Sequence, residues 1–249
     1  MKTSITTILW GKIHTLGEFR KVLTEVRKIG YDGIGLETRL LSLEMIKDPN
    51  LVKKTLREAG VENSGSYSTM KLQDVDWASQ AGTPILWVVA RGDKSFREAL
   101  GVIRELKSRA AKSGIAIALH NHLGTRFETE AQMRKALTQV KGLQVCFDTA
   151  HAEAADFDTP GFIRDFHERI ALVHVKDLRV KVPKARVSFT KDFVNAGEGI
   201  LNFSKIVGAL KDSGYDGNLM LETEVIVGRR PGEVAKEGYD RIQTLLREA

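Results

Sequence analysis

Four apolar runs in the second half of the chain are each followed directly by a histidine or an acidic residue. In chain order these residues are His120, Asp148, His174 and Glu222. Imidazole and carboxylate groups together suit a divalent transition metal such as Mn²⁺, Co²⁺, Zn²⁺ or Fe²⁺. Any one of them alone fits a hydrogen-bonding loop residue or a helix N-cap equally well, but the set of four favours a metal. We therefore predict a metal site with positions left open for a substrate.

Further polar residues lie close to these ligands in the sequence. His122 is two residues after His120, and Lys176 is two residues after His174, so each pair shares one face of a strand. We predict that His122 and Lys176 contact the substrate or carry protons, although Lys176 fits a surface charge equally well. His151, in the same strand-end cluster, is a second histidine that could assist proton transfer.

Three more residues are predicted to contact the substrate. Glu37 ends an apolar run in the first part of the chain, and Glu198 lies between two glycines that allow close backbone approach to a ligand. A tight turn before a helix is the alternative for the Glu198 segment. Arg179 lies on a neighbouring loop, as do Arg126 and Arg186, and any of them could pair with a phosphate or carboxylate.

Short apolar runs alternate with longer amphipathic stretches along the whole chain, and this alternation predicts the fold. The predicted strands are Ser4–Trp10, Gly33–Thr38, Glu62–Ser68, Pro84–Ala90, Ala116–Asn121, Gln144–Asp148, Leu172–Lys176 and Asn218–Glu222. The predicted helices are Leu16–Ile29, Pro49–Ala59, Gln73–Ala81, Ser95–Ser113, Thr129–Val140, Pro160–Phe166, Phe203–Ser213 and Gly232–Arg247. Eight strand–helix units in about 250 residues predict an α/β fold, a single (β/α)8 TIM barrel over residues 1–249, whose chemistry lies at the carboxyl ends of the strands. A doubly wound open sheet is the alternative.

One internal repeat supports the barrel. Gly-Tyr-Asp-Gly occurs at residues 30–33 and again at residues 214–217, each time after an amphipathic stretch and before an apolar run. Both copies end in Glu-Thr, so that Glu37 and Glu222 occupy equivalent strand ends. Two units of the same construction are expected in a fold made of repeated units. The longest irregular stretch, residues 178–200, follows a predicted strand and is expected to belong to the active site.

Composition excludes several classes of protein. The 249 residues are 42% apolar and 28% charged, with a formal net charge of +6, which indicates a globular chain. The single cysteine, Cys146, cannot form an internal disulfide, and no signal peptide or membrane-spanning run is evident. We therefore expect a cytoplasmic protein with no membrane partner. The pI near 9.3 raises the question of nucleic acid, but the basic residues are interleaved with acidic ones, as on solvated helix faces, so no nucleic-acid partner is expected.

The chain resembles the xylose-isomerase-like TIM barrels, which include sugar isomerases and epimerases, inosose dehydratases and the endonuclease IV type of DNA repair enzyme. The resemblance extends over essentially the whole chain. It is densest at residues 147–151 (Phe-Asp-Thr-Ala-His), at residues 174–177 (His-Val-Lys-Asp), and from Gly197-Glu198-Gly199 to Glu222. Residues 120–125 (His-Asn-His-Leu-Gly-Thr) and 176–179 (Lys-Asp-Leu-Arg) look more like the inosose dehydratases.

The resemblance implies a divalent metal, often Mn²⁺ or Co²⁺, held by His120, Asp148, His174 and Glu222. In such epimerases the fifth-strand ligand is commonly a glutamate that forms a two-base pair with the eighth-strand glutamate, whereas this chain has His120 there. Related barrels often form dimers, so a homodimer is one expected state. The endonuclease branch needs a trinuclear site with more histidines and acids than this chain has at its strand ends.

Our first hypothesis from the sequence is a metal-dependent isomerase or epimerase of a small carbohydrate, a sugar or polyol-derived ketone. Polarisation of a metal-bound carbonyl would acidify the neighbouring C–H group. Glu222 would then move the proton, assisted by His151 or His122. The rival hypothesis is an inosose-dehydratase-like lyase that uses the same site. Endonuclease-like DNA repair and a barrel without catalysis are the remaining alternatives.

Overall fold

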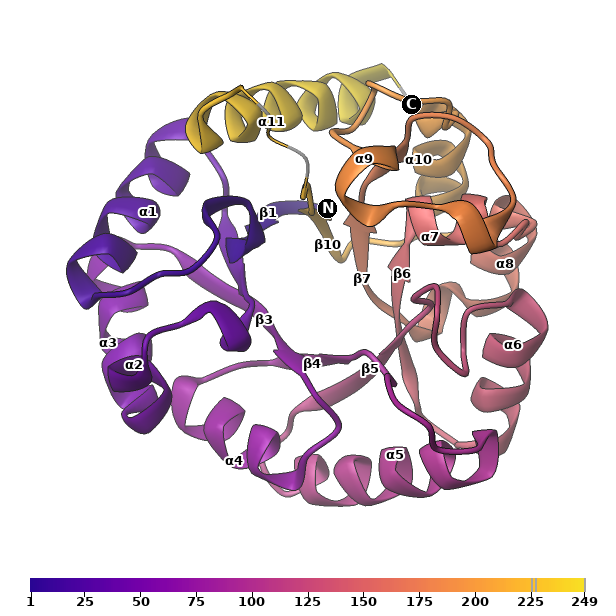
Figure 1. Ribbon diagram of the computed structural model, residues 1–249, viewed down its shortest axis with the longest axis horizontal. Helices are drawn as coiled ribbons and strands as arrows, with labels where there is room; N and C mark the ends of the chain where they lie inside the picture. Colours follow the sequence, from indigo (N-terminus) through magenta and orange to yellow (C-terminus); the bar gives the residue numbers. More distant parts are fainter. Residues whose placement is uncertain (225, 227, 249) are drawn as a thin grey trace.

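The computed structural model describes residues 1–224, 226 and 228–248. The strands are β1 (Lys2–Thr6), β2 (Gly33–Leu36), β3 (Glu62–Ser68), β4 (Ile85–Val88), β5 (Ala116–His120), β6 (Gln144–Asp148), β7 (Ile170–Val175), β8 (Asp177–Leu178), β9 (Phe193–Val194) and β10 (Asn218–Leu221). Eight of them form a closed parallel barrel in the order β1-β10-β7-β6-β5-β4-β3-β2 (Figure 1). The predicted (β/α)8 barrel is therefore confirmed, and the open sheet is excluded because β1 pairs with both β2 and β10.

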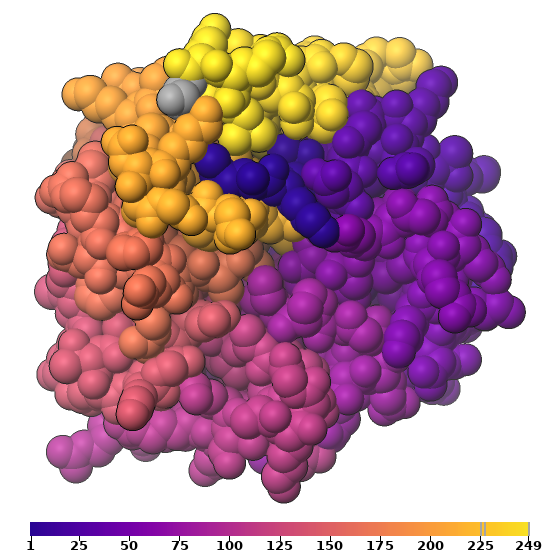
Figure 2. Space-filling model, turned by 180° about the vertical axis from the view of Figure 1, so that it is seen from behind, coloured from indigo at the N-terminus to yellow at the C-terminus, as the bar shows by residue number. Residues whose placement is uncertain are grey.

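A ring of helices surrounds the barrel (Figure 1). The α-helices are α1 (Leu16–Ile29), α2 (Leu43–Lys47), α3 (Pro49–Ala59), α4 (Leu72–Ala81), α5 (Phe96–Ala111), α6 (Glu130–Gln139), α7 (Thr149–Ala154), α8 (Thr159–Phe166), α9 (Phe189–Asp192), α10 (Phe203–Asp212) and α11 (Pro231–Glu248). Short 3-10 helices are η1 (Thr7–Trp10), η2 (Thr38–Leu40), η3 (His167–Arg169) and η4 (Lys184–Arg186). Helix α11 packs beside α1 and β1, so the two ends of the chain lie together at the closure of the barrel (Figure 2). No helix in the described part of the chain is both long and apolar enough to cross a membrane.

Local sequence explains where the major helices begin and end. Thr15 and Ser95 accept hydrogen bonds from the third residue of α1 and α5, respectively, as N-cap side chains do. Asp48 caps α3 in the same way, with Pro49 at its first position. Gly30 ends α1 in the left-handed conformation, which glycine adopts without a steric penalty.

The first predicted strand was too long. Residues 7–10, which we expected to continue the strand from Ser4, form the 3-10 helix η1 instead. In the register of the barrel, Ile5 lies opposite Leu221, the last residue of β10. Thr6 lies opposite Gly35, which is one residue before the end of β2. Beyond Thr6, β10 has ended and only one residue of β2 remains, so the chain turns, and the Thr7 hydroxyl accepts a hydrogen bond from the Glu37 amide.

The buried Trp87 side chain packs in the barrel interior with residues that include Leu172 and Met220. Its ring lies close to two glycines of the neighbouring strands, and a Cβ atom at Gly35 or Gly65 would come within 3.1 Å of it. The same ring packs edge-on against His174, with ring centroids 5.3 Å apart. Trp87 thus supports the histidine from inside the barrel at the level where polar residues begin.

Candidate metal centre and active site

His120, Asp148, His174 and Glu222 converge at the carboxyl-terminal mouth of the barrel. They come from the adjacent strands β5, β6 and β7 and from the residue after β10. One ligand atom of each residue lies within 4.8 Å of those of the other three. His174 Nδ1 is 3.0 Å from Glu222 Oε2, and His120 Nε2 is 3.7 Å from Asp148 Oδ2. All four side chains are buried. The structure therefore brings the four predicted ligands together around one point.

The position of Asp148 is fixed by its neighbours. It lies opposite His174 in the register of β6 and β7, and its Oδ1 accepts a hydrogen bond from the His151 amide at 2.9 Å as the N-cap of α7. The Asn121 amide group bonds the Asp148 backbone twice, donating to its carbonyl at 3.0 Å and accepting from its N–H at 2.8 Å. These bonds occupy Oδ1 and both backbone groups, so Oδ2 is directed to the centre of the cluster.

Several polar atoms of the cluster lack partners among the described residues. Asp148 Oδ2, His120 Nδ1 and His174 Nε2 are buried and accept or donate no hydrogen bond. A buried polar atom without a partner costs free energy, and a carboxylate oxygen most of all. A divalent cation bound by two imidazoles and two carboxylates would satisfy the carboxylate oxygens. The donor set and its geometry therefore fit such a cation.

Lys176 lies inside this cluster, so it is not a surface charge. Its Nζ is 2.5 Å from Glu222 Oε1, 3.2 Å from Glu224 Oε1 and 3.5 Å from Asp148 Oδ2. Burial opposes the charge, but Glu222 and Asp148 hold the pKa of Lys176 well above its usual value. Burial also opposes ionisation of Glu222, yet Lys176 and His174 hold the pKa of Glu222 well below its usual value. The pair is therefore an ammonium and a carboxylate.

His122 and His151 are held as neutral imidazoles. Burial lowers the pKa of His122 to about 4 and lowers the pKa of His151 well below its usual value. An Arg91 nitrogen lies 3.0 Å from His122 Nε2, and a guanidinium can only donate, so His122 carries its proton on Nδ1 and donates to the Leu123 carbonyl at 2.6 Å. His151 Nδ1 accepts from the Leu123 amide, so its proton is on Nε2. His122 lines the cavity, whereas His151 packs behind it with ring centroids 4.2 Å apart.

A cavity of about 100 Å³ opens beside the cluster, and Glu37 and Glu222 both line it. Burial and the charge of Glu222 raise the pKa of Glu37 to about 7, although Arg39 donates a hydrogen bond to its carboxylate at 2.8 Å. Two carboxyl groups in one cavity thus have pKa values shifted in opposite directions. Such a pair is typical of an acid and a base that act on one substrate.

Four titratable residues of this cavity were not predicted from the sequence: Arg39, Tyr67, Arg91 and Glu224. Glu224 is two residues after Glu222, and the two-residue spacing that identified Lys176 would have found it. Arg91 directly follows the predicted strand that ends at Ala90, so the strand-end criterion would have found it too. Arg39 and Tyr67 carry no comparable signal, since Arg39 lies in the 3-10 helix η2 and Tyr67 lies within β3 rather than after a strand end.

Two predicted substrate contacts lie away from the cluster. Glu198 forms an ion pair with Arg229 at 2.7 Å and does not line the cavity. The glycines around Glu198 instead donate backbone hydrogen bonds, from Gly197 and Gly199, to the buried Asp177 carboxylate at 3.0 and 2.9 Å. Arg179 is exposed, and its Nε donates to the Lys191 carbonyl at 3.1 Å within the β7–α10 segment.

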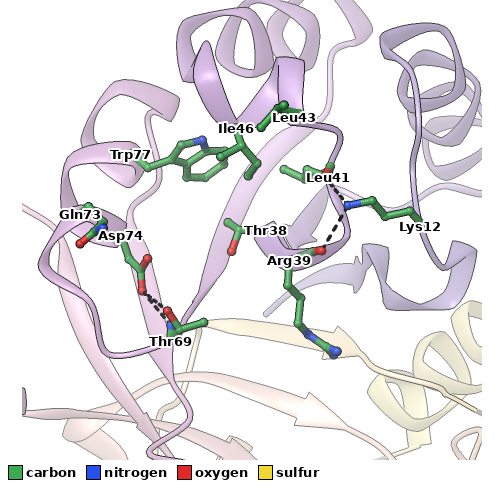
Figure 3. A pocket seen from close by; sticks show the side chains of 10 residues that line it. All are labelled: Lys12, Thr38, Arg39, Leu41, Leu43, Ile46, Thr69, Gln73, Asp74 and Trp77. Carbon is green, nitrogen blue, oxygen red and sulfur yellow. Dashed lines mark hydrogen bonds between the residues drawn. The ribbon is translucent and has the colours of Figure 1, made fainter.

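A larger groove of about 490 Å³ adjoins the mouth and is built on the loops after β2 and β3 (Figure 3). Trp77, Ile46, Leu43 and Leu41 form its apolar side, and Thr69 and Asp74 lie opposite. Arg39 lines both this groove and the cavity beside the metal ligands. The Arg39 guanidinium therefore forms the wall between the two.

Comparison with known proteins agrees with this geometry. Residues 23–245 match a family model described as xylose isomerase-like TIM barrel. An inosose dehydratase of Lacticaseibacillus casei is 31% identical over 143 residues, which are 53% of this chain and 48% of that protein. An inosose dehydratase of Erwinia tasmaniensis is 28% identical over 145 residues, 53% of this chain and 49% of that protein. The matched region thus spans about half the length of these curated relatives.

Solved structures share the fold at low sequence identity. The IolI protein with a bound zinc atom has a TM-score of 0.83 at 16% identity, covering 100% of this chain and 99% of that one. An L-ribulose 3-epimerase has a TM-score of 0.79 at 16% identity, covering 99% and 94%. The family match covers most of the sequence, and the chain belongs to the xylose isomerase-like TIM barrel family.

Proposed function

We propose that the protein is a divalent-metal-dependent lyase that removes water from a small cyclic polyol ketone of the inosose type. The observation that carries this proposal is the pair Glu37 and Glu222, two carboxyl groups that line one cavity beside the metal ligands and have opposed pKa shifts. The similarity to inosose dehydratases supports loss of water as the reaction. The lyase is thus our first candidate here, whereas the sequence alone favoured an isomerase or epimerase over a lyase.

A bound cation at His120, Asp148, His174 and Glu222 would supply Lewis-acid polarisation of a ketone oxygen. The ionised Glu222 carboxylate removes the proton from the carbon next to the ketone. The neutral Glu37 carboxyl donates its proton to the hydroxyl on the next carbon as the C–O bond breaks. The products are water and an unsaturated ketone, so atoms and charges balance.

The remaining groups of the site keep these two carboxyls in their roles. Lys176 bonds Glu222 at 2.5 Å and so favours its ionised form. Arg39 bonds Glu37 and holds its carboxyl group in place at the cavity wall. Arg91 and His122 line the same cavity and supply hydrogen-bonding groups for the hydroxyls of the substrate.

Epimerisation is the second candidate, and the same pair of carboxyls favours it. One carboxyl would remove the proton from one face of the carbon, and the other would return a proton to the opposite face. A small polyol ketone is the substrate in both cases, because the cavity of about 100 Å³ is too confined for a polymer.

Product analysis decides between them. The protein is incubated with scyllo-inosose and, separately, with a ketohexose, each with Mn²⁺ or Co²⁺. Loss of 18 mass units with a new enone absorbance supports the lyase, whereas solvent deuterium incorporation without loss of mass supports the epimerase. Glu37→Gln is the matched control, since it keeps the shape of the site and removes the acid. The absence of both products with every metal would contradict the proposal.

A further inference from the structure

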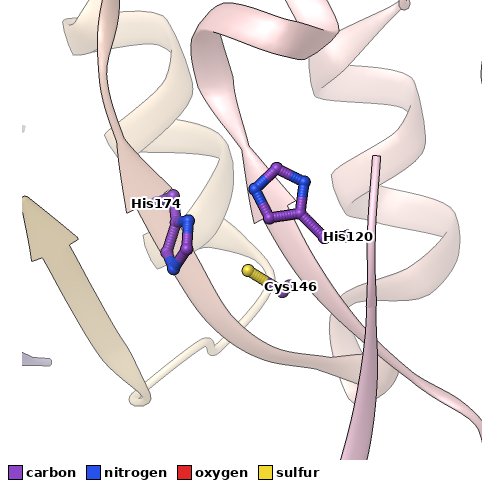
Figure 4. Close-up of side chains that lie close together, drawn as sticks. All are labelled: His120, Cys146 and His174. Atoms are coloured by element: carbon purple, nitrogen blue, oxygen red, sulfur yellow. The ribbon is translucent and has the colours of Figure 1, made fainter. Parts of the chain in front are cut away.

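The only cysteine of the sequence lies directly below the metal ligands. Cys146 is two residues before Asp148 in β6, so its side chain points to the same face one layer deeper in the barrel. Figure 4 shows its sulfur directed between the imidazole rings of His120 and His174. One ligand atom from each of these three residues lies within 4.8 Å of the others. All three side chains are buried.

A second observation points to a ligand at this position. His120 and His174 approach Asp148 with Nε2 and Nδ1, respectively. Both nitrogens of the buried His174 ring lack a hydrogen-bond partner among the described residues. In metal sites the second nitrogen of a ligand histidine is normally bound to a carboxylate, a carbonyl or water. Among the described residues no such group bonds His174 Nε2, and the thiol of Cys146 lies close to the ring.

We propose that His120, Cys146 and His174 form a second cation site, which takes thiophilic ions such as Cd²⁺, Zn²⁺ or Cu⁺. Two imidazoles and one thiolate are soft or borderline ligands. The upper set, which is His120, Asp148, His174 and Glu222, contains two carboxylates and suits harder ions such as Mn²⁺. Binding forms a metal–sulfur bond and breaks the S–H bond, and the proton passes to solvent. No change of oxidation state is involved.

The electrostatics of the barrel interior are compatible with this site. The cation must displace the proton of the buried thiol when the metal–sulfur bond forms. Asp148 and Glu222, one layer above, supply negative charge close to the cation. Leu172 and Met220 border the cysteine on the inner face of the barrel and exclude water from it.

The two sites share His120 and His174, and a neutral imidazole has a single lone pair, so each histidine can bind only one cation and the sites are mutually exclusive. An ion held by Cys146 takes two of the four ligands from the upper set. Thiophilic ions should therefore displace Mn²⁺ from the protein and prevent its return. This consequence holds whichever reaction the upper site catalyses.

Cadmium is the probe that tests the proposal. Titration of the intact, metal-free protein with Cd²⁺ should produce an ultraviolet thiolate-to-cadmium charge-transfer band. Because the chain has one cysteine, that band can only report Cys146. Cys146→Ser should remove the band and weaken Cd²⁺ binding at least about tenfold, while the variant still binds Mn²⁺, as measured by electron paramagnetic resonance. Circular dichroism melting of the variant checks that it is folded.

Asp148→Asn provides the reverse control, since it should abolish Mn²⁺ binding and retain the cadmium band. A wild-type protein without the band at saturating Cd²⁺ would overturn the proposal. Simultaneous binding of Mn²⁺ and Cd²⁺ would overturn the shared-ligand arrangement. Failure of the lyase proposal would appear only in product analysis, so the two can be distinguished.

Discussion

Lys176 and Glu222 form an ion pair inside the barrel, with Nζ and Oε1 2.5 Å apart and neither side chain open to solvent by more than 7%. The same ammonium lies 3.5 Å from Asp148 and 3.2 Å from Glu224. It therefore balances two of the four candidate metal ligands, Asp148 and Glu222. Glu224 remains as its partner when a divalent cation takes those two carboxylates, so the three carboxylates are then balanced by the ammonium and the cation.

Lys176→Met should destabilise the metal-free protein and increase its affinity for divalent cations. Removing one partner of a buried ion pair leaves uncompensated carboxylates, at a cost of about 3 kcal/mol or more in the free energy of unfolding. The substitution also removes the positive charge of Lys176, which competes with the metal for the carboxylates of Asp148 and Glu222. Urea unfolding with a chelator and calorimetric titration with Mn²⁺ measure the two effects.

The exposed pair of Lys2 and Glu62, 2.7 Å apart, gives a matched control. Lys2→Met also removes a lysine from a short ion pair, but solvent screens that pair, so stability and metal affinity should both stay close to wild type. A fall in Mn²⁺ affinity in Lys176→Met would show that Lys176 does not compete with the cation.

Asp148→Ala and His174→Ala should each abolish metal retention while the barrel stays folded. Both residues supply ligand atoms to the cluster, so their loss should exceed the roughly 10- to 100-fold effect of changes around a metal site. Elemental analysis after gel filtration measures retention, and circular dichroism measures folding. Activity that survives in both variants would show that the metal assignment is wrong.

Asn121→Ala should weaken metal binding without removing a ligand. The Asn121 amide makes two hydrogen bonds to the backbone of Asp148 and so places its carboxylate. We expect a loss in Mn²⁺ affinity of roughly 10- to 100-fold, with the number of bound ions unchanged. Asn202→Ala is a suitable control, because Asn202 caps α10 by bonding the Lys205 amide and does not line the cavity. Equal Mn²⁺ affinities in the two variants would exclude a positioning role for Asn121.

The convergence of the four candidate ligands could be predicted because their placement follows from two regularities. Parallel strands end at one edge of a barrel, and side chains two residues apart share a face. Those rules put His120, Asp148, His174 and Glu222 together without any knowledge of distances. The length of the first strand could not be predicted in this way, because it depends on where its neighbours β2 and β10 end.

The segment between β7 and α10 shows what the sequence leaves open. Its path is fixed by Asp177, which accepts backbone hydrogen bonds from Gly197, Gly199 and Leu201, 20 to 24 residues further along the chain. No local pattern indicates which carboxylate organises a loop at that separation. For the same reason the sequence did not reveal that Glu198 pairs with Arg229.

The contribution of Glu37 to the stability of the metal-free protein should fall as the pH rises from about 4.5 to 7. The pKa of Glu37 is raised from 4.5 to about 7 in the fold, so over this range the folded protein binds more protons than the unfolded chain, and raising the pH favours unfolding. At about 1.4 kcal/mol for each pKa unit, the loss reaches about 3 kcal/mol. Glu37→Gln stays neutral at every pH and should lack this contribution, so the difference in the free energy of unfolding between wild type and variant should change between pH 5 and pH 8. Urea unfolding at the two pH values measures both proteins, and the same change with pH in both would show that Glu37 does not contribute.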